Sequence, residues 1–252
     1  MIFIIILGIL FVYALYEYRN IQTKHLNAKD FNQSHSRNIR IVYLSDIQYD
    51  LKGMFFQNTL MKQIVSLINK ENPDIVVFGG DYIHHKSTKV FEYLKMIEAP
   101  KIGILGNHDY KDLEGVIKGC QNSQIKLLIN QTYAFNNITF IGLDDLREGH
   151  PLLPNLNPND YHVLLIHDPD QFETLTNTHQ FNVTLAGHLH GGQVTLFGKY
   201  APILPSKYGQ KYRYGFIKRN NSTLYVSSGL GGWVFGLPLR FFAKPEIVII
   251  DL

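Results

Sequence analysis

Two histidines separated by one residue, His188 and His190, follow a β-prone run and lie between glycines. Side chains at positions i and i+2 of extended backbone point the same way, so both imidazoles can converge at the end of a strand. Neutral imidazole is the commonest protein metal ligand. An isolated pair of this kind is more often hydrogen-bonded within a loop, so a metal site requires matching ligands elsewhere.

Several other apolar, β-branched runs also end in residues that can bind a metal, and a turn follows each of them. These residues are Asp46 with Gln48, Asp81, Asn107 with His108 and Asp109, and His167. In α/β folds, sites gather at the carboxyl ends of strands. A single Asp after a strand is usually a helix cap, but strand ends carrying such different ligand types together indicate one metal centre.

The ligand types narrow the chemistry of this centre. Cys120 is the only cysteine, which excludes an internal disulfide and any cysteine-based zinc site. Carboxylate, amide and imidazole ligands suit Mn, Fe, Mg, Ni or Zn at a hydrolytic centre. Two divalent metals roughly 3.5–4 Å apart can hold an attacking hydroxide while clamping a phosphate oxygen. Asp81 is the natural bridging ligand, and Asn107 adds a ligand without charge.

The elements that must position these residues alternate between strands and helices. A chain of 252 residues fits one α/β domain or two small ones. The pattern predicts a layered α/β fold with a largely parallel first half and a second sheet packed against the first. Expected strands cover residues 39–44, 74–78, 101–105, 126–129, 138–143, 161–166, 181–185, 223–227 and 246–252, and expected helices cover 55–69, 90–97, 113–118 and 170–176.

The N-terminal run of residues 1–16 contains no charge. Spanning a bilayer takes roughly 20 apolar residues, so the run is marginal. No basic residue precedes it and its cleavage site is poor. We therefore predict a membrane anchor over residues 1–18, with a cleaved signal peptide or a buried core helix as alternatives. A polar linker with little structure is expected over 19–38, followed by one domain over 39–252. Basic residues follow the run, which predicts an inner-membrane protein with its domain on the cytoplasmic side.

The motifs resemble those of the calcineurin-like metallophosphoesterases. The blocks are Ser45-Asp46-Ile47-Gln48, Gly79-Gly80-Asp81, Gly106-Asn107-His108-Asp109, His167 and Gly187-His188-Leu189-His190, in the family's usual order and spacing. The resemblance runs over residues 39–252 and is greatest to the small membrane-associated bacterial branch. It implies a four-layer α/β/β/α sandwich. That branch includes general phosphodiesterases and UDP-2,3-diacylglucosamine pyrophosphatases of lipid A synthesis.

The resemblance also implies a role for each residue and two divalent metal ions, with Mn²⁺ expected and Fe, Mg, Ni or Zn as alternatives. His108 would stabilise the transition state or protonate the leaving oxygen, and Asp109 would orient the His108 ring. One metal would be held by Asp46, Gln48, Asp81 and His190, and the other by Asp81, Asn107, His167 and His188.

Gln48 departs from the family pattern, which usually has histidine at this position. An amide oxygen binds transition metals less well than imidazole does. Three interpretations remain open at this point. The metal at this site is weakly held and exchangeable, or His84 or His85 substitutes as a ligand, or the centre is largely mononuclear or inactive. We expect activity to survive because every other block is intact.

These features lead to a functional hypothesis of metal-dependent hydrolysis of the pyrophosphate of a nucleotide-linked lipid, of the UDP-2,3-diacylglucosamine type. The apolar segment 233–242 and the basic, aromatic segment 199–220 suit an amphiphilic phosphate ester at a membrane surface, although core filling and a solvated hairpin explain them equally simply. The alternatives are a phosphodiesterase of other substrates and a non-catalytic envelope-binding protein. A net charge of only +3 gives no reason to expect a stable nucleic-acid partner.

Overall fold

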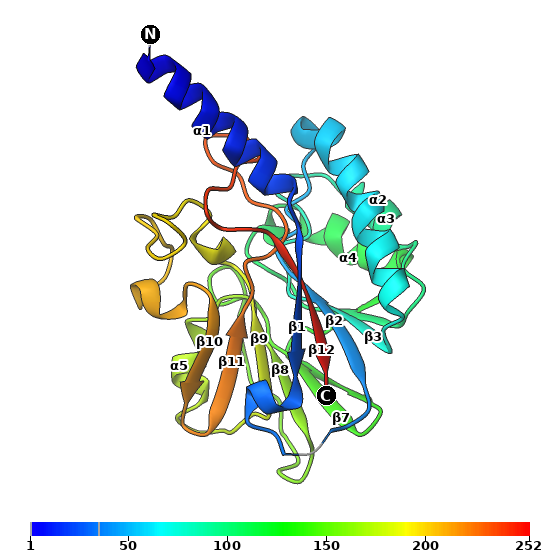
Figure 1. Cartoon of the computed structure of the whole chain (residues 1–252). Coiled ribbons are helices and arrows are strands. Elements are labelled where there is room, and N and C mark those ends of the chain that lie inside the picture. The colour runs from blue at the N-terminus through cyan, green and yellow to red at the C-terminus, as the bar shows by residue number, and fades with distance from the viewer. Residues whose placement is uncertain (1, 35) are drawn as a thin grey trace.

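Two six-stranded sheets form the centre of the protein in the computed structural model, which describes residues 2–34 and 36–252 (Figure 1). In spatial order, the first sheet contains β1 (Gln22–Asn27), β12 (Glu246–Asp251), β2 (Arg40–Leu44), β3 (Ile75–Phe78), β4 (Lys101–Gly103) and β5 (Ile125–Leu127). The second contains β10 (Gly215–Arg219), β11 (Ser222–Val226), β9 (Val183–Ala186), β8 (His162–Leu165), β7 (Ile138–Gly142) and β6 (Gln131–Phe135). The predicted mixed α/β fold with two sheets is confirmed.

The strands that precede the predicted ligands run parallel within their sheets. β2, β3 and β4 are parallel neighbours, and so are β8 and β9. Parallel neighbours present their carboxyl ends at the same edge of a sheet. The side chains that follow these strands are therefore brought to one end of the molecule.

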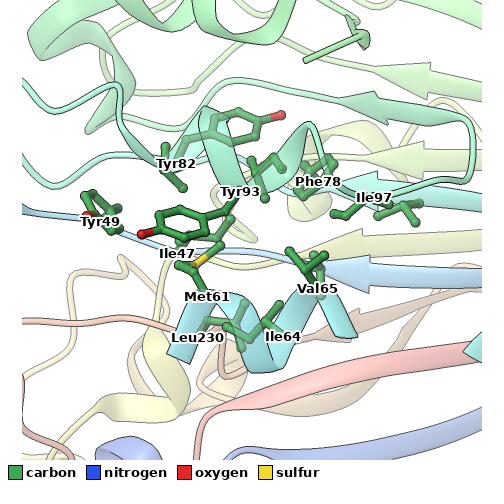
Figure 2. Packing of buried hydrophobic residues seen from close by; sticks show 14 of the residues in the cluster. Ile47, Tyr49, Met61, Ile64, Val65, Phe78, Tyr82, Tyr93, Ile97 and Leu230 are labelled. Atoms are coloured by element: carbon green, nitrogen blue, oxygen red, sulfur yellow. The ribbon is translucent and has the colours of Figure 1, made fainter. Parts of the chain in front are cut away.

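Helices cover the outer faces of the two sheets. One apolar cluster joins the first sheet to α2 (Met54–Glu71), α3 (Val90–Leu94) and α4 (Leu113–Asn122), and Figure 2 shows Met61, Ile64 and Val65 of α2 within it. A second cluster lies between the sheets, and a third packs α5 (Gln171–Leu175) against the second sheet. Covered on both faces, β3 is buried at all its positions, as is typical of a continuous apolar strand.

The short 3₁₀ turns lie in the connections between these elements. They are η1 (Ala28–Phe31), η2 (Leu51–Gly53), η3 (Asp109–Asp112), η4 (His190–Gly192) and η5 (Gly209–Tyr212). Two of them, η3 and η4, begin within the predicted site blocks.

The expectation of a linker with little structure over 19–38 is wrong. Residues 22–27 form the edge strand β1, which pairs in parallel with β12. The sequence pattern did not predict this strand because its side chains are mostly polar. An edge strand needs only main-chain pairing and a few apolar contacts. Leu26 and Phe31 supply those contacts in the core between the sheets.

The predicted anchor forms helix α1 (Ile2–Arg19), but part of it packs on the domain. Ala14 and Tyr18 are buried, and the Tyr18 hydroxyl accepts a hydrogen bond from the Gln57 side chain at 3.1 Å. The helix stands away from the body at its N-terminal end (Figure 1). Across the described residues, none of the helices combines the length and the apolar character needed to cross a bilayer. Met1 and His35, which fall within the predicted anchor and linker, lie outside the described residues.

Candidate metal centre

The predicted ligands follow five strands and reach one edge of the two sheets. Asp46 and Gln48 follow β2, Asp81 follows β3, Asn107 follows β4, His167 follows β8, and His188 and His190 follow β9. The centre of the group is formed by Asp46, Asp81 and His167, whose ligand atoms lie within 4.8 Å of one another. All three side chains are buried. Two buried carboxylates this close together are unfavourable unless a cation or a proton compensates their charge, and burial, with the charge of Asp81, raises the pKa of Asp46.

The hydrogen bond of His167 Nδ1 to a backbone carbonyl turns Nε2 toward the other predicted ligands. The Nδ1 atom lies 2.8 Å from the Gly79 carbonyl oxygen, so Nδ1 carries the proton and donates it. Nε2 lies 3.5 Å from Asp81 Oδ1 and 3.3 Å from His188 Nδ1. A backbone carbonyl that fixes the tautomer in this way is the usual support of a metal-binding imidazole.

Several other buried polar atoms of the site have no hydrogen-bond partner. They are Asn107 Oδ1, His188 Nε2 and His190 Nδ1. Leaving buried polar atoms unpaired costs roughly 1–3 kcal/mol each, so such atoms need an explanation. Two carboxylates, an amide oxygen and three imidazoles form a donor set that fits divalent transition metals.

The backbone around the centre is held in the left-handed region at five of the predicted ligands. The φ angles are 52° at Asp46, 45° at Gln48, 56° at Asp81, 69° at His188 and 50° at His190. Non-glycine residues in this region are strained by roughly 1–3 kcal/mol each and cluster at functional sites. The surrounding packing is equally tight: a Cβ on Gly106 would overlap Asp81, and one on Gly187 would overlap Asp46.

The electrostatics favour the protonation states that metal binding needs at His188, His190 and Asp81. Burial, and then the charge of His167, lowers the pKa of His188 to about 3. Burial, and then the charge of Arg240, lowers the pKa of His190 well below its usual value. Burial works against ionisation of Asp81, but the charge and contact of His167 outweigh it and lower the pKa of this carboxyl. His188 and His190 are therefore neutral and Asp81 is ionised. Burial lowers the pKa of His167, but the charges of Asp81 and Asp46 outweigh it and raise this pKa well above its usual value, so metal binding at His167 Nε2 would release a proton.

Gln48 lies among the predicted ligands, although it is not a histidine. Its Nε2 is 2.9 Å from Asp81 Oδ2 and 3.1 Å from His190 Nε2. Rotating the amide by 180° would present the oxygen to the same neighbours. Of the two neighbouring histidines, His85 is engaged elsewhere, because its Nδ1 is 2.6 Å from Asp50 Oδ2. The His84 ring stacks between Trp233 and His108 and leaves its buried Nδ1 without a partner, so His84 stays an alternative ligand.

His108 lies beside the centre with its ring held by groups that we did not predict. Its backbone N–H donates to Asp81 Oδ1 at 2.8 Å. Its Nδ1 is 3.0 Å from the His84 carbonyl oxygen and 2.8 Å from Lys111 Nζ. Lys111 is one residue that sequence reasoning missed, and its position three residues after His108 was the available signal.

Asp109 does not have the ring-orienting role that we expected. Its carboxylate accepts hydrogen bonds from four backbone amides: those of Asp81 at 2.8 Å, Tyr82 at 2.9 Å, Ile83 at 3.4 Å and Gly106 at 2.9 Å. These amides belong to the loops that present Asp81 and Asn107. Asp109 therefore fixes the backbone of two ligand loops instead of the His108 ring.

Asp168 and Arg240 are two further residues that sequence reasoning missed. Asp168 Oδ2 lies 3.8 Å from His188 Nε2 and 2.9 Å from Arg147 Nε. Arg240 is fully buried, and its guanidinium donates to backbone carbonyls of His190, Ser228, Gly231 and Ala243. It lies inside the apolar segment 233–242, where a single charged residue does not by itself predict that it binds buried backbone carbonyls.

Comparison with known proteins identifies the family. A family model described as calcineurin-like phosphoesterase matches residues 39–192. The chain belongs to this family. The resemblance inferred from the motifs is thereby confirmed, and the protein is a hydrolase of the metallophosphoesterase type.

Three relatives show which members of the family this chain is similar to. The metallophosphoesterase YkuE of Bacillus subtilis (strain 168) is 35% identical over 236 residues, which cover 84% of this chain and 78% of YkuE. UDP-2,3-diacylglucosamine pyrophosphatase LpxG of Chlamydia muridarum (strain MoPn / Nigg) is 25% identical, with 86% and 84% covered. Phosphodiesterase YaeI of Escherichia coli (strain K12) is also 25% identical, with 88% and 85% covered.

Proposed function

We propose that this metallophosphoesterase hydrolyses a phosphodiester or pyrophosphate bond at a centre of two divalent metal ions, Mn²⁺ in the first instance. The observation that carries the proposal is the buried cluster of Asp46, Asp81 and His167, within 4.8 Å of one another. Gln48 and His190 would complete one metal site. Asn107 and His188 would complete the other.

The metal ions and the residues around the centre would have different roles in the reaction. Bound divalent ions supply Lewis acidity toward the phosphate and lower the pKa of water at the site. His108 lies next to the cluster, where its imidazole can give a proton to the leaving oxygen. Lys111 and the His84 carbonyl, at 2.8 and 3.0 Å from His108 Nδ1, hold the ring.

For the substrate we propose a nucleotide-linked lipid of the UDP-2,3-diacylglucosamine type, as in lipid A biosynthesis. The similarity to the pyrophosphatase LpxG supports this class of substrate. Large apolar side chains are also exposed on the segments that follow His190, including Phe197 at 80% exposure and Phe235 at 102%. An amphiphilic substrate needs apolar surface of this kind near the hydrolytic groups.

We also propose that the chain lies at the cytoplasmic face of the inner membrane and is attached through α1. The N-terminal half of α1 exposes a row of apolar side chains, among them Ile2, Ile4, Ile9 and Val12 at 63–74% exposure. Arg19 at the end of α1 is basic and is exposed. Apolar burial and attraction to anionic headgroups together favour membrane binding.

A second candidate is hydrolysis of phosphodiesters without a lipid, which the similarity to phosphodiesterase YaeI favours. The two are separated by supplying the purified protein with UDP-2,3-diacylglucosamine and, in parallel, with bis(p-nitrophenyl) phosphate. Release of UMP at a higher kcat/KM than p-nitrophenol release supports the lipid substrate. Good turnover of the soluble diester with no UMP release rejects it and leaves the phosphodiesterase.

A further inference from the structure

A cavity of about 320 Å³ lies between the C-terminal half of α1 and the segments around Phe197 and Phe242. Among the described residues, none of the predicted metal ligands lines it. One lining residue, Gly191, directly follows His190 in the chain. The side chains that give it chemical character are Tyr13, Glu17, Phe197, Arg213, Phe242 and Lys244.

Two cationic side chains on one wall suit a phosphate group. Arg213 is fixed in place because Nη1 donates to the Gly191 carbonyl at 2.7 Å and Nη2 to the Gly198 carbonyl at 2.9 Å. A guanidinium carries five N–H groups, so three remain beyond these two bonds. The exposed Lys244 adds a mobile ammonium. A fixed guanidinium with a mobile ammonium is a common combination for phosphate recognition.

A buried carboxylate and several aromatic rings also line the cavity. Glu17 is 2% exposed, and its Oε1 accepts a hydrogen bond from the Ala243 N–H at 2.5 Å. The Tyr13 and Phe242 rings lie 5.3 Å apart, and the Phe197 and Phe242 rings 5.7 Å apart. The Tyr13 side chain also hydrogen-bonds Glu17, and a carboxylate beside an aromatic side chain is suited to an organic ammonium group. The cavity therefore offers partners for a phosphate and an amine together.

Exposed apolar side chains belong to the segments that line the cavity. α1 contributes Tyr13 and Glu17 to the lining, and its apolar N-terminal end projects away from the body of the protein (Figure 1). Phe197 and Phe242 are exposed at 80% and 38%, so acyl chains attached to a bound headgroup would meet apolar side chains. A free phosphorylated amine would leave this surface uncovered.

We propose that this cavity binds the zwitterionic headgroup of a membrane phospholipid of the phosphatidylethanolamine type. Arg213 and Lys244 take the phosphate, and Glu17 with the Tyr13 ring takes the ammonium group. The acyl chains lie against Phe197 and the exposed half of α1. None of the predicted metal ligands, all of which the structure describes, lines this cavity, so lipid binding there does not depend on the proposed reaction, although Phe197 also belongs to the apolar surface proposed for the substrate.

The test is native mass spectrometry of the full-length, metal-loaded protein, released from detergent with lipids of identical acyl chains. We expect phosphatidylethanolamine to be retained at least about tenfold more tightly than phosphatidylglycerol, which lacks the amine, or diacylglycerol, which lacks the phosphate. Equal retention of all three would overturn the proposal. Binding of soluble glycerophosphoethanolamine as tight as that of the lipid would also overturn it, because the acyl chains would then have no role.

Two substitutions link retention to the cavity. Lys244→Glu should weaken phosphatidylethanolamine binding about tenfold, whereas Lys70→Glu, at the far end of α2, should change it less than about twofold. Each lowers the net charge of +3 by two, so equal losses would mean non-specific attraction and refute the site. Glu17→Gln should remove the preference for phosphatidylethanolamine over phosphatidylglycerol, and an unchanged preference would also contradict the proposal.

Two controls separate this site from the hydrolytic centre. Lys244→Glu should hydrolyse bis(p-nitrophenyl) phosphate at the wild-type rate, because Lys244 lies outside the catalytic groups. Retention of the lipid should persist after EDTA treatment, since the lining contains no predicted metal ligand. Loss of lipid binding with EDTA would instead assign the lipid to the metal centre.

Discussion

Replacing Arg240 by Met should destabilise the protein far more than replacing a surface arginine. Arg240 is fully buried, and burial lowers the pKa of its guanidinium to about 10, so it remains charged at neutral pH. It donates to the carbonyls of His190 at 3.2 Å, Ser228 at 2.7 Å, Gly231 at 2.6 and 2.9 Å, and Ala243 at 3.0 Å. Methionine fills much of the volume but offers no donor.

The magnitude follows from the acceptors that lose their partner. The carbonyls of Ser228, Gly231 and Ala243 would be left unpaired, at a cost of roughly 1–3 kcal/mol each. The His190 carbonyl, in contrast, keeps its bond from the Gln193 N–H at 3.0 Å. Relaxation of the loops and relief from burying a charge offset part of that sum. We expect the free energy of unfolding to fall by about 3–5 kcal/mol, the usual cost of breaking a buried charged network. Because one acceptor is the His190 carbonyl, metal affinity should fall as well.

The assay is urea denaturation followed by tryptophan fluorescence, with metal content measured on the same samples. Arg40→Met is the matched control, because Arg40 pairs with Asp251 at 2.8 Å but is 41% exposed at its side chain. An exposed pair of this kind is worth less than about 1 kcal/mol. If Arg240→Met lost no more stability than Arg40→Met, the buried arginine would not be what holds these loops together.

Three further predictions concern the metal centre and its supports. Gln48→His should raise the affinity of the weaker metal by at least about tenfold and bring the metal stoichiometry closer to two, whereas Gln63→His on the exposed face of α2 should do neither. Metal titration measures the affinity and elemental analysis the stoichiometry. An unchanged affinity would mean that the Gln48 amide does not weaken metal binding. Asp109→Asn should lower the free energy of unfolding by about 2–4 kcal/mol, because one acceptor oxygen becomes a donor that faces backbone N–H groups. Asp112→Asn at the N-cap of α4 should lower it by less than about 0.5 kcal/mol. Equal melting temperatures for the two variants would contradict the role of Asp109. Removal of metal with EDTA should abolish hydrolysis and lower the melting temperature, since ligand at 1,000 times its Kd stabilises the folded state by about 4 kcal/mol; full activity in EDTA would exclude a metal mechanism.

The positions of the ligands were predictable from the sequence because strand ends carry them. Short buried runs such as residues 75–78 are recognisable as strands, and parallel strands place the residues that follow them, including Asp46, Asp81 and His167, at a common edge. Neither the order of the strands nor the distances were needed to infer a metal centre.

The supports of the site were not predictable, because they depend on contacts between distant segments. β1 pairs through its backbone with β12, more than 200 residues later, so its side chains carry little information. Asp109 binds backbone amides, which have no sequence signature. Arg240 is one charge in an apolar segment, and its burial depends on loops that fold around it.

Asp81 gives the most direct test of the central claim, that this chain is a metal-dependent phosphoesterase. Metal content and hydrolysis of bis(p-nitrophenyl) phosphate are measured together for the wild type, for Asp81→Asn and for Asp160→Asn, an exposed control. We predict about two divalent ions per wild-type and control chain, and a loss of metal with at least a 100-fold loss of activity for Asp81→Asn, roughly the upper cost of losing even a supporting group of a metal site. An Asp81→Asn protein that retains full activity would contradict the account.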